Sequence, residues 1–331
     1  MASSSSTAAK PFASLSLDLD NKWSYLKTHG DAGWNSFPSY LDVLVPRVLE
    51  FLRARNLTIT FFIVGQDAAL DKNREALGQI RHAGHDLGNH SFSHEPWMHL
   101  SPETDIEKEI ASTETNLEAA TGHKPVGFRG PGYACSPTIL RVLKRRGYRY
   151  DASTLPSCLG PLARAYYFMK TNLPPEEREQ RKTLFGSWSD GRRPLKPYRW
   201  SIGQQTLIEI PITTLPLLRV PVHFSYLIYL SILSPALARN YFRSALKLCK
   251  ASGIQPSLLL HPLDFLGAED EADLSFFPGM NLPAERKLEV ISDALLLLAK
   301  DFTIINLEQH AQIVAAEPPG LVVPLPEVTR S

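Results

Sequence analysis

Residues 14–20 read Ser-Leu-Ser-Leu-Asp-Leu-Asp, and the fold prediction starts from this stretch. Its polar and apolar residues alternate with the period of two that is typical of a β-strand. Asp18 and Asp20 end the run, and residues two apart on a strand point to the same side. We therefore expect a first strand over residues 14–19 that brings two carboxylates to its carboxyl end.

Strand and helix signals alternate along most of the remaining chain. Apolar residues at helical spacing, together with capping signals, predict helices over residues 40–53, 73–83, 101–121, 137–146, 235–251 and 283–299. Short apolar runs predict further strands near residues 57–64, 85–88, 126–128, 148–150, 207–212, 256–261 and 302–305. This order indicates an α/β fold, an irregular (β/α) barrel of seven or eight parallel strands.

The alternation lapses over residues 153–205, where proline and charged residues are frequent. We interpret this stretch as a surface insertion in a single barrel domain that spans residues 14–316. We expect a disordered N-terminus over residues 1–13. The proline-rich residues 317–331 are expected to form a C-terminal tail.

Composition limits the partners and the compartment. The chain has 331 residues with 35 basic and 34 acidic side chains, so no global field attracts nucleic acid, and we expect no such partner. Three widely spaced cysteines suggest a reducing compartment, so we expect a cytoplasmic location. We also expect no conventional signal peptide and no membrane-spanning helix, because no long uninterrupted apolar run is present.

The segment Asn89-His90-Ser91-Phe92-Ser93-His94-Glu95 carries the clearest chemical signal. Two imidazoles four residues apart can point the same way from one turn. A carboxylate from another strand would complete a three-ligand site with open positions, which is the arrangement of a catalytic divalent metal. The alternative is a pair of ordinary surface or helix-capping histidines.

Other polar residues follow other predicted strands, and the carboxyl ends of barrel strands are where such folds place their chemistry. Arg129, Asp151 and His261 each stand at such an end. Each has a simpler explanation alone, as a surface ion pair or a turn residue. Their recurrence at several strand ends favours a common site.

In this order the residues resemble the polysaccharide deacetylase (NodB-homology, carbohydrate esterase) superfamily. The matching segments are Asp18-Leu19-Asp20, His90-Ser91-Phe92-Ser93-His94, Arg129-Gly130-Pro131-Gly132-Tyr133, Asp151-Ala152-Ser153 and Leu258-Leu259-Leu260-His261. Leu19 splits the Asp pair and Gly132 precedes Tyr133, which departs from the usual pattern. The split pair is closer to the subgroup with peptidoglycan deacetylases, cyclic-amide hydrolases and lipid-linked aminosugar deformylases. It leaves open which Asp is a metal ligand.

The resemblance implies that Asp20, His90 and His94 hold a divalent metal. Zinc is the expected ion, and Co²⁺, Ni²⁺ or Mn²⁺ also suit imidazole and carboxylate ligands. Asp18 would then be the general base that takes a proton from water. Arg129 would position Asp18 through a charged hydrogen bond.

The resemblance also assigns the leaving-group side of the reaction. His261 would donate a proton to the departing amine, with Asp151 holding its ring. The backbone N–H of Tyr133 or a neighbour would stabilise the oxyanion. Asp264, three residues after His261, is either a partner of that histidine or a loop residue.

The implied reaction is metal-dependent hydrolysis of the N-acetyl group of an amino sugar in a polysaccharide or a lipid-linked glycan. A hydrolase of a small cyclic amide or formamide is the first alternative. A non-catalytic carbohydrate-binding member of the fold is the second. Release of acetate from N-acetylglucosamine oligomers distinguishes these.

Residues 215–233 are unusually apolar and aromatic. We interpret them as a buried loop and helix. The alternative is an exposed lip for peripheral membrane contact, helped by basic residues of the insertion, namely Arg178, Arg181, Lys182, Arg192 and Arg193. A homo-oligomer contact is a third use of this surface.

Overall fold

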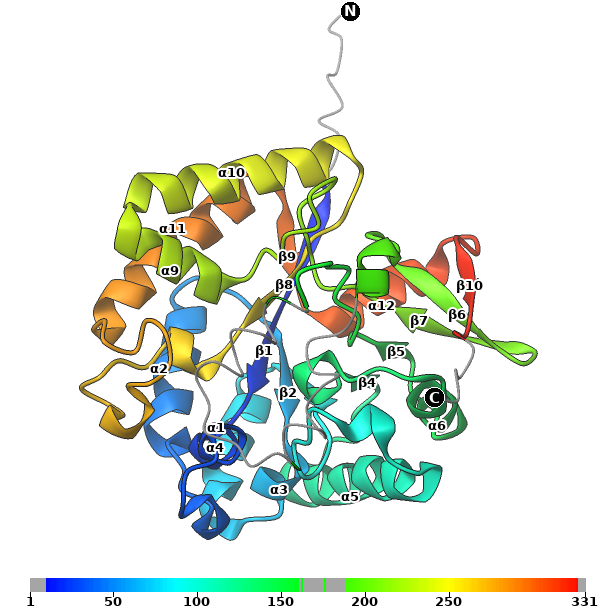
Figure 1. Ribbon diagram of the computed structural model, residues 1–331, viewed down its shortest axis with the longest axis horizontal. Helices are drawn as coiled ribbons and strands as arrows, with labels where there is room; N and C mark the ends of the chain where they lie inside the picture. Colours follow the sequence, from blue (N-terminus) through cyan, green and yellow to red (C-terminus); the bar gives the residue numbers. More distant parts are fainter. Residues whose placement is uncertain (1–9, 161, 163–175, 177–187, 327–331) are drawn as a thin grey trace, which may run out of the picture.

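The computed structural model describes residues 10–160, 162, 176 and 188–326, and they form an α/β structure around one sheet (Figure 1). The strands are β1 (Phe12–Leu19), β2 (Thr60–Ile63), β3 (Asp86–Asn89), β4 (Gly127–Phe128), β5 (Tyr150–Asp151), β6 (Tyr198–Ile202), β7 (Gln205–Glu209), β8 (Ser257–Leu260), β9 (Thr303–Ile305) and β10 (Val322–Pro324). The helices are α1 (Lys22–His29), α2 (Leu41–Arg53), α3 (Gly65–Ala68), α4 (Arg74–His82), α5 (Glu103–Thr121), α6 (Pro137–Arg145), α9 (Phe224–Leu233), α10 (Pro235–Ala251), α11 (Ala284–Asp301) and α12 (Leu307–Ala316).

The sheet has the order β10-β6-β7-β5-β4-β3-β2-β1-β8, and β9 pairs with the start of β1. The expectation of an α/β fold with a mainly parallel sheet is confirmed. One pair differs: β6 and β7 are antiparallel. They form a hairpin whose two-residue turn contains Gly203 with a φ of 60°, a conformation that glycine adopts without strain.

The sheet curves towards a barrel, but strand pairing does not join β8 to β7 within the described residues. Residues 210–214 cross this gap without forming a strand. The N–H of Ile210 donates to the carbonyl of Asp151 (2.9 Å), and the N–H of Thr213 donates to that of Ser257 (3.0 Å). The predicted irregular barrel is therefore connected at this point by the backbone hydrogen bonds of an extended segment.

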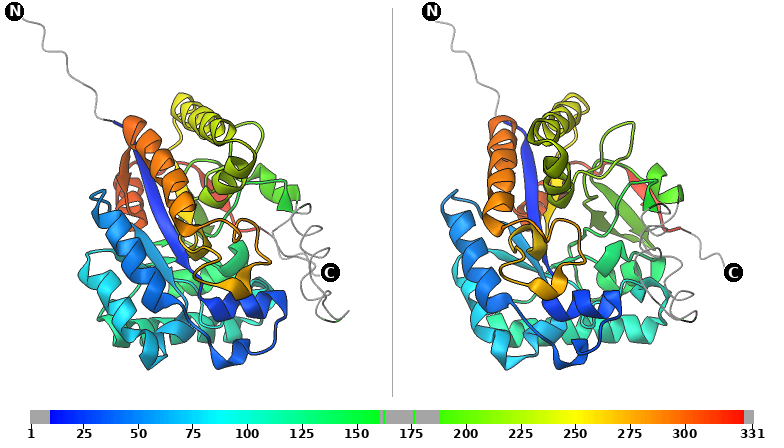
Figure 2. Two further views of the ribbon diagram at one scale, coloured as in Figure 1. Left: turned by 90° about the vertical axis from the view of Figure 1, so that its left-hand side faces the viewer. Right: turned by 60° about the vertical axis from the view of Figure 1, so that its left-hand side comes forward.

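The polar side of β1 is buried, although alternation usually places that side in water. Leu15, Leu17 and Leu19 belong to the main hydrophobic core, while Ser14 and Ser16 are also fully buried. Helices cover the strand on both sides, and Figure 2 shows β1 running between α11 and the α9–α10 pair. The alternation thus predicted the strand correctly and marks the side that carries Asp18.

The chain ends and the insertion differ in part from the predictions. β1 begins at Phe12, two residues early, and residues 1–9 lie outside the described residues. β10 pairs with β6, so part of the predicted tail and part of the predicted insertion belong to the sheet. Arg178, Arg181 and Lys182 of the insertion lie outside the described residues.

The segment 215–233 is neither fully buried nor fully exposed. Phe224, Leu227 and Ile228 pack into the main core. Leu217 and Leu233 are 90% and 78% exposed. None of the described helices combines the length and the apolar composition needed to cross a membrane.

Candidate active site

Asp20, His90 and His94 come together where β1 and β3 end. One possible ligand atom from each of these buried residues lies within 4.8 Å of the others. The Nε2 atoms of His90 and His94 lie 3.3 and 3.0 Å from Oδ1 of Asp20. The fold thus brings together the three residues that the sequence proposed as metal ligands, from strands about seventy residues apart.

The loop that carries the two histidines has an unusual backbone. Ser91 and His94 have φ values of 59° and 51°, which are uncommon for residues with a side chain. Glu109 of α5 offsets this cost, because its carboxylate accepts the N–H groups of Phe92 (2.9 Å) and Ser93 (2.8 Å). Sequence reasoning missed Glu109, since it is one of several acidic residues in α5.

A second hydrogen bond orients the ring of His90. Its Nδ1 lies 2.6 Å from the carbonyl oxygen of Arg129, so Nδ1 carries the proton and donates it. Nε2 is then left to face Asp20. This is the usual arrangement of a metal-binding histidine, whose second nitrogen is held by a backbone carbonyl.

The electrostatics of the cluster suit a cation. Burial alone would raise the pKa of Asp20, but the imidazoles of His94 and His90 lower it far below its ordinary value. Burial lowers the pKa of His90, and the carboxylates of Asp18 and Asp20 overcome this and raise it. Three electron-pair donors pointing at one another repel unless a proton or a metal ion lies between them, so these residues fit a divalent metal.

Asp18 is held beside this cluster by a buried ion pair. Nη1 of Arg129 donates to Oδ1 of Asp18 (2.7 Å) and to the hydroxyl of Ser16 (2.8 Å). Nε of Arg129 donates to the carbonyl of Ala152 (2.9 Å), and its guanidinium lies over the ring of Phe62 at 4.4 Å. The predicted pairing of Arg129 with Asp18 is therefore present, and four contacts fix the guanidinium.

His261 has different partners from those predicted. The backbone N–H of His261 donates to Asp264 (2.8 Å), whose other carboxylate oxygen accepts the hydroxyl of Ser225 (2.7 Å). The same hydroxyl lies 3.5 Å from Nδ1 of His261. Asp264 is thus a partner of His261 rather than a simple loop residue, and Ser225 of α9 connects it to the ring.

Asp151 does not hold His261, so this prediction is wrong. Asp151 is fully buried and accepts the hydroxyl of Ser153. Burial, the charge of Glu209 and a hydrogen bond with Glu209 raise the pKa of Asp151 well above its ordinary value. These neighbours favour the protonated form of Asp151, and its contacts are structural.

The backbone N–H of Tyr133 also has another partner. It donates to the carbonyl of Gly130 (3.0 Å) in the short 3₁₀ turn Pro131–Tyr133, so this N–H is already bonded within the turn. The oxyanion role given to Tyr133 or a neighbour stays a prediction. The phenol of Tyr133 instead lies 3.5 Å from Nδ1 of His223. Gly132 takes a φ of 55° in this turn, which explains the glycine before the tyrosine.

His223 is a residue of this region that sequence reasoning left as a packing residue. It is buried, and its ring centroid lies 6.4 Å from that of His261. Burial and the nearby His261 and Arg129 lower the pKa of His223 to about 3, so its ring is neutral at pH 7. No spacing in the sequence links His223 to the other residues, because α9 brings it to them.

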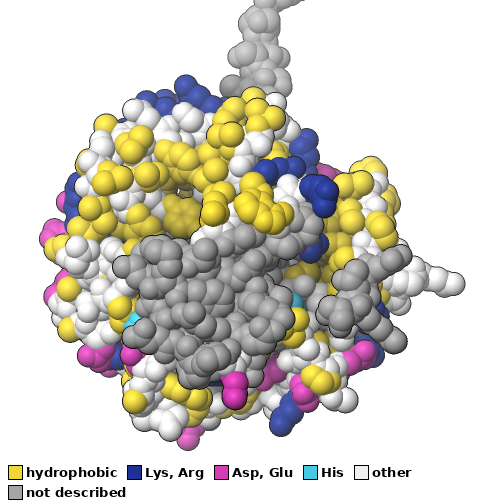
Figure 3. All heavy atoms as spheres, in the orientation of Figure 1, with side chains coloured by type: hydrophobic (Ala, Val, Ile, Leu, Met, Phe, Trp, Pro, Cys, Tyr) yellow, Lys and Arg dark blue, Asp and Glu magenta, His cyan; other side chains and the backbone are white. Residues whose placement is uncertain are grey.

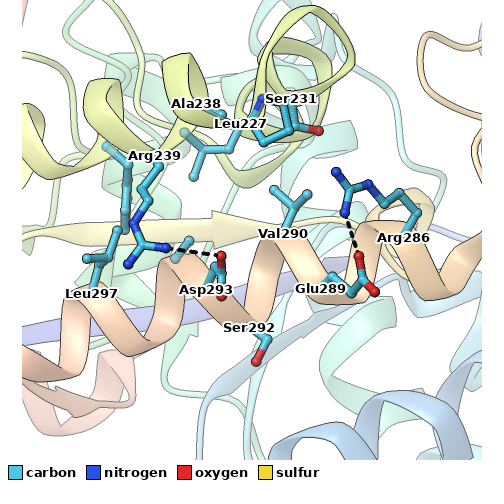
Figure 4. Close-up of a pocket in the computed structure, with 13 residues that line it drawn as sticks. Leu227, Ser231, Ala238, Arg239, Arg286, Glu289, Val290, Ser292, Asp293 and Leu297 are labelled. Atoms are coloured by element: carbon cyan, nitrogen blue, oxygen red, sulfur yellow. Dashed lines mark hydrogen bonds and ion pairs between the residues drawn. The ribbon is translucent and has the colours of Figure 1, made fainter.

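A groove of about 350 Å³ lies elsewhere, between α9, α10 and α11 (Figure 4). Apolar side chains line it, and its rim carries the ion pairs Arg239–Asp293 and Arg286–Glu289. None of its lining residues belongs to the cluster of predicted site residues. The groove is therefore separate from the candidate active site.

The chain matches the polysaccharide deacetylase family model over residues 31–150. The predicted resemblance to this family is confirmed. The match includes His90, His94 and Arg129 and stops short of Asp18, Asp20 and His261, which the structure brings to the same region.

Curated relatives are similar to this chain over about a third of its length. A peptidoglycan deacetylase from Helicobacter pylori is 27% identical over 36% of this chain and 40% of its own. A chitooligosaccharide deacetylase from Azorhizobium caulinodans is 34% identical over 32% of this chain and 50% of its own. The chain thus spans at most half of the length of these two relatives.

A solved structure shares the fold over nearly the whole chain. It is a polysaccharide deacetylase-like protein from Mycobacterium smegmatis, with a TM-score of 0.61 and 19% identity. The alignment covers 97% of this chain and 96% of that chain. At this identity the likeness supports the fold alone.

Proposed function

We propose that this chain is a metal-dependent hydrolase that removes the N-acetyl group from an amino sugar in a glycan. The observation that carries the proposal is the convergence of Asp20, His90 and His94 beside the Asp18–Arg129 ion pair. The relatives named above are deacetylases of N-acetylated glycans, which supports this substrate class.

Asp20, His90 and His94 would hold the metal ion, through one carboxylate oxygen and two Nε2 atoms. When bound, such an ion supplies Lewis-acid activation of the acyl carbonyl and of water. The hydrogen bond from His90 to the Arg129 carbonyl keeps Nε2 available for it. Zinc is the expected ion for this ligand set.

Asp18 takes the proton from the attacking water, and Arg129 keeps its carboxylate in one orientation. The C–N bond of the amide then breaks to release acetate. His261 donates a proton to the departing nitrogen, because an amine anion is a very poor leaving group. Ser225 and Asp264 position the ring of His261 for this transfer.

Metal analysis and acetate release test this proposal together. The purified chain is incubated with N-acetylglucosamine oligomers with and without chelator. One metal per chain and chelator-sensitive acetate release are the expected results. Acetate release that persists without metal, or bound metal without turnover of any N-acetylated glycan, would overturn the proposal; the second result favours formamide or cyclic-amide substrates, or a binding protein.

A further inference from the structure

The charges of this chain are unevenly distributed, although its net charge is only +1. Residues 210–263 contain five Lys or Arg residues and no Asp or Glu. The five are Arg219, Arg239, Arg243, Lys247 and Lys250. Four of them lie on α10, which follows α9 after a single residue.

The turn between α9 and α10 exposes large apolar side chains. Ile232, Leu233 and Leu237 are 50%, 78% and 49% exposed. They lie on a convex hairpin rather than in a groove, and Figure 3 shows hydrophobic side chains over this part of the molecule. Exposed leucine and isoleucine side chains in one place mark an interaction surface.

The basic side chains of α10 continue this surface along the helix. Ala236, Asn240, Arg243 and Lys247 are spaced by four, three and four residues, so they share one face, and all four are exposed. Arg239 and Lys250 pair with Asp293 and Asp301 of α11. Arg243 and Lys247 form no ion pair with any described residue.

We propose that this hairpin surface, made of Ile232, Leu233, Leu237, Arg243 and Lys247, docks on an anionic lipid bilayer. Apolar side chains at a turn can enter the headgroup region, while adjacent cations bind lipid phosphates. The apolar side chains thus suit the region beneath the headgroups, and the cations suit the anionic headgroups themselves.

The charge of the hairpin surface favours a bilayer over a second copy of the chain as its partner. In a twofold dimer the same surface faces itself, so Arg243 and Lys247 would face equal cations. An anionic bilayer offers the opposite charge over the whole surface. The bilayer is therefore the partner that complements both the apolar and the basic residues.

The hairpin surface is linked to the candidate active site through α9. Ser225 in the first turn of α9 contacts Asp264 and the ring of His261, while Leu233 ends the same helix. Docking would place this side of the catalytic residues near the membrane. If the proposed deacetylase activity holds, lipid-linked amino sugars are then the favoured substrate class.

Vesicle co-sedimentation of the full chain tests the proposal. Vesicles of phosphatidylcholine, with and without one third phosphatidylglycerol, serve as probes at low and high salt. The chain is expected to bind the anionic vesicles and to dissociate at high salt. Arg243→Gln combined with Lys247→Gln should weaken binding about twenty-fivefold, since each cation near an anionic surface contributes about fivefold.

Matched control variants show whether binding depends on the hairpin surface or only on the total charge and hydrophobicity of the chain. Arg53→Gln with Arg74→Gln removes two exposed cations elsewhere and should leave binding unchanged. Leu233→Ser should weaken binding, whereas Leu321→Ser, at a 57% exposed position, should not. Circular dichroism checks that each variant is folded.

Three results would overturn the proposal: no binding to anionic vesicles, equal loss in the control variants, or self-association through Leu233 without lipid binding. Asp18→Asn, which should be inactive, is expected to bind vesicles like the wild type. Docking and catalysis can therefore fail independently of each other.

Discussion

The metal-ligand end of the candidate site and its His261 end differ in how the chain builds them. Asp20, His90 and His94 stand directly after β1 and β3, and each is part of a short sequence motif. At the other end, His261 stands after β8 and obtains its partner Ser225 from α9. The first end depends on strand register, whereas the second depends on where one helix packs.

This difference explains which residues could be placed at the candidate site from the sequence. Neighbouring parallel strands deliver their carboxyl ends to one edge, so residues at those ends must meet. Strand register does not determine the side-chain partners of His261. Asp151 follows a strand and matches a motif, yet it pairs with Glu209, while Asp264 takes the place beside His261.

The largest effect should come from His94→Ala. It removes one of three donors, so we expect more than about a hundredfold loss of metal affinity together with loss of turnover. Metal content after dialysis and acetate release measure both effects. His82→Ala, at an exposed position of α4, is the control and should change neither. Full metal occupancy in His94→Ala would remove His94 from the ligand set.

Asp18→Asn tests whether Asp18 is the general base rather than a metal ligand. An amide cannot take a proton from water, so we expect kcat to fall by about 10²- to 10⁴-fold with the metal retained. Metal analysis and single-turnover acetate release are the measurements. If this variant loses its metal and Asp20→Asn keeps it, the roles of the two aspartates are exchanged.

Ser225→Ala tests the partners of His261. Losing one hydrogen bond to the network of Asp264 and His261 should lower kcat about tenfold. Ser225→Thr should restore most of the activity. The matched control is Ser231→Ala, because this buried serine of the same helix donates only to the carbonyl of Ile228 (2.7 Å). Equal effects of the two alanine variants would indicate a general disturbance of α9.

Asp151→Asn should change stability rather than catalysis. The raised pKa of Asp151 means that the folded state keeps a proton that the unfolded state loses above about pH 4. This contribution to the free energy of unfolding is fully present below that pH and is lost as pH rises, by up to about 1.4 kcal/mol per pH unit. Asparagine mimics the protonated acid, so the variant should show a flatter dependence from pH 5 to 8.

Urea unfolding of the wild type and of Asp151→Asn over this pH range measures how the free energy of unfolding depends on pH. The kcat–pH profile of Asp151→Asn should match that of the wild type. A shifted profile in Asp151→Asn would restore Asp151 to the role that sequence reasoning gave it.

Most of the regular structure was predictable from residue pattern. Helix α10 has its predicted bounds, and α2, α4 and α6 agree to within one residue at each end. Helix α9 was not separated from its apolar surroundings, because apolar residues on every side remove the helical period. Without that helix, neither Ser225 nor His223 could be placed near His261.

The sequence alone determined the strand ends and the chemistry placed on them: the carboxylates after β1, the imidazoles after β3 and Arg129 after β4. These follow from periodicity and short motifs, which are local properties of the chain. The tertiary structure alone decided the partners of several strand-end residues. Glu109 reaches the histidine loop, Ser225 reaches His261, and Glu209 reaches Asp151, each across a long separation in sequence. Buried polar groups must find partners wherever packing brings them, and packing is a property of the whole fold.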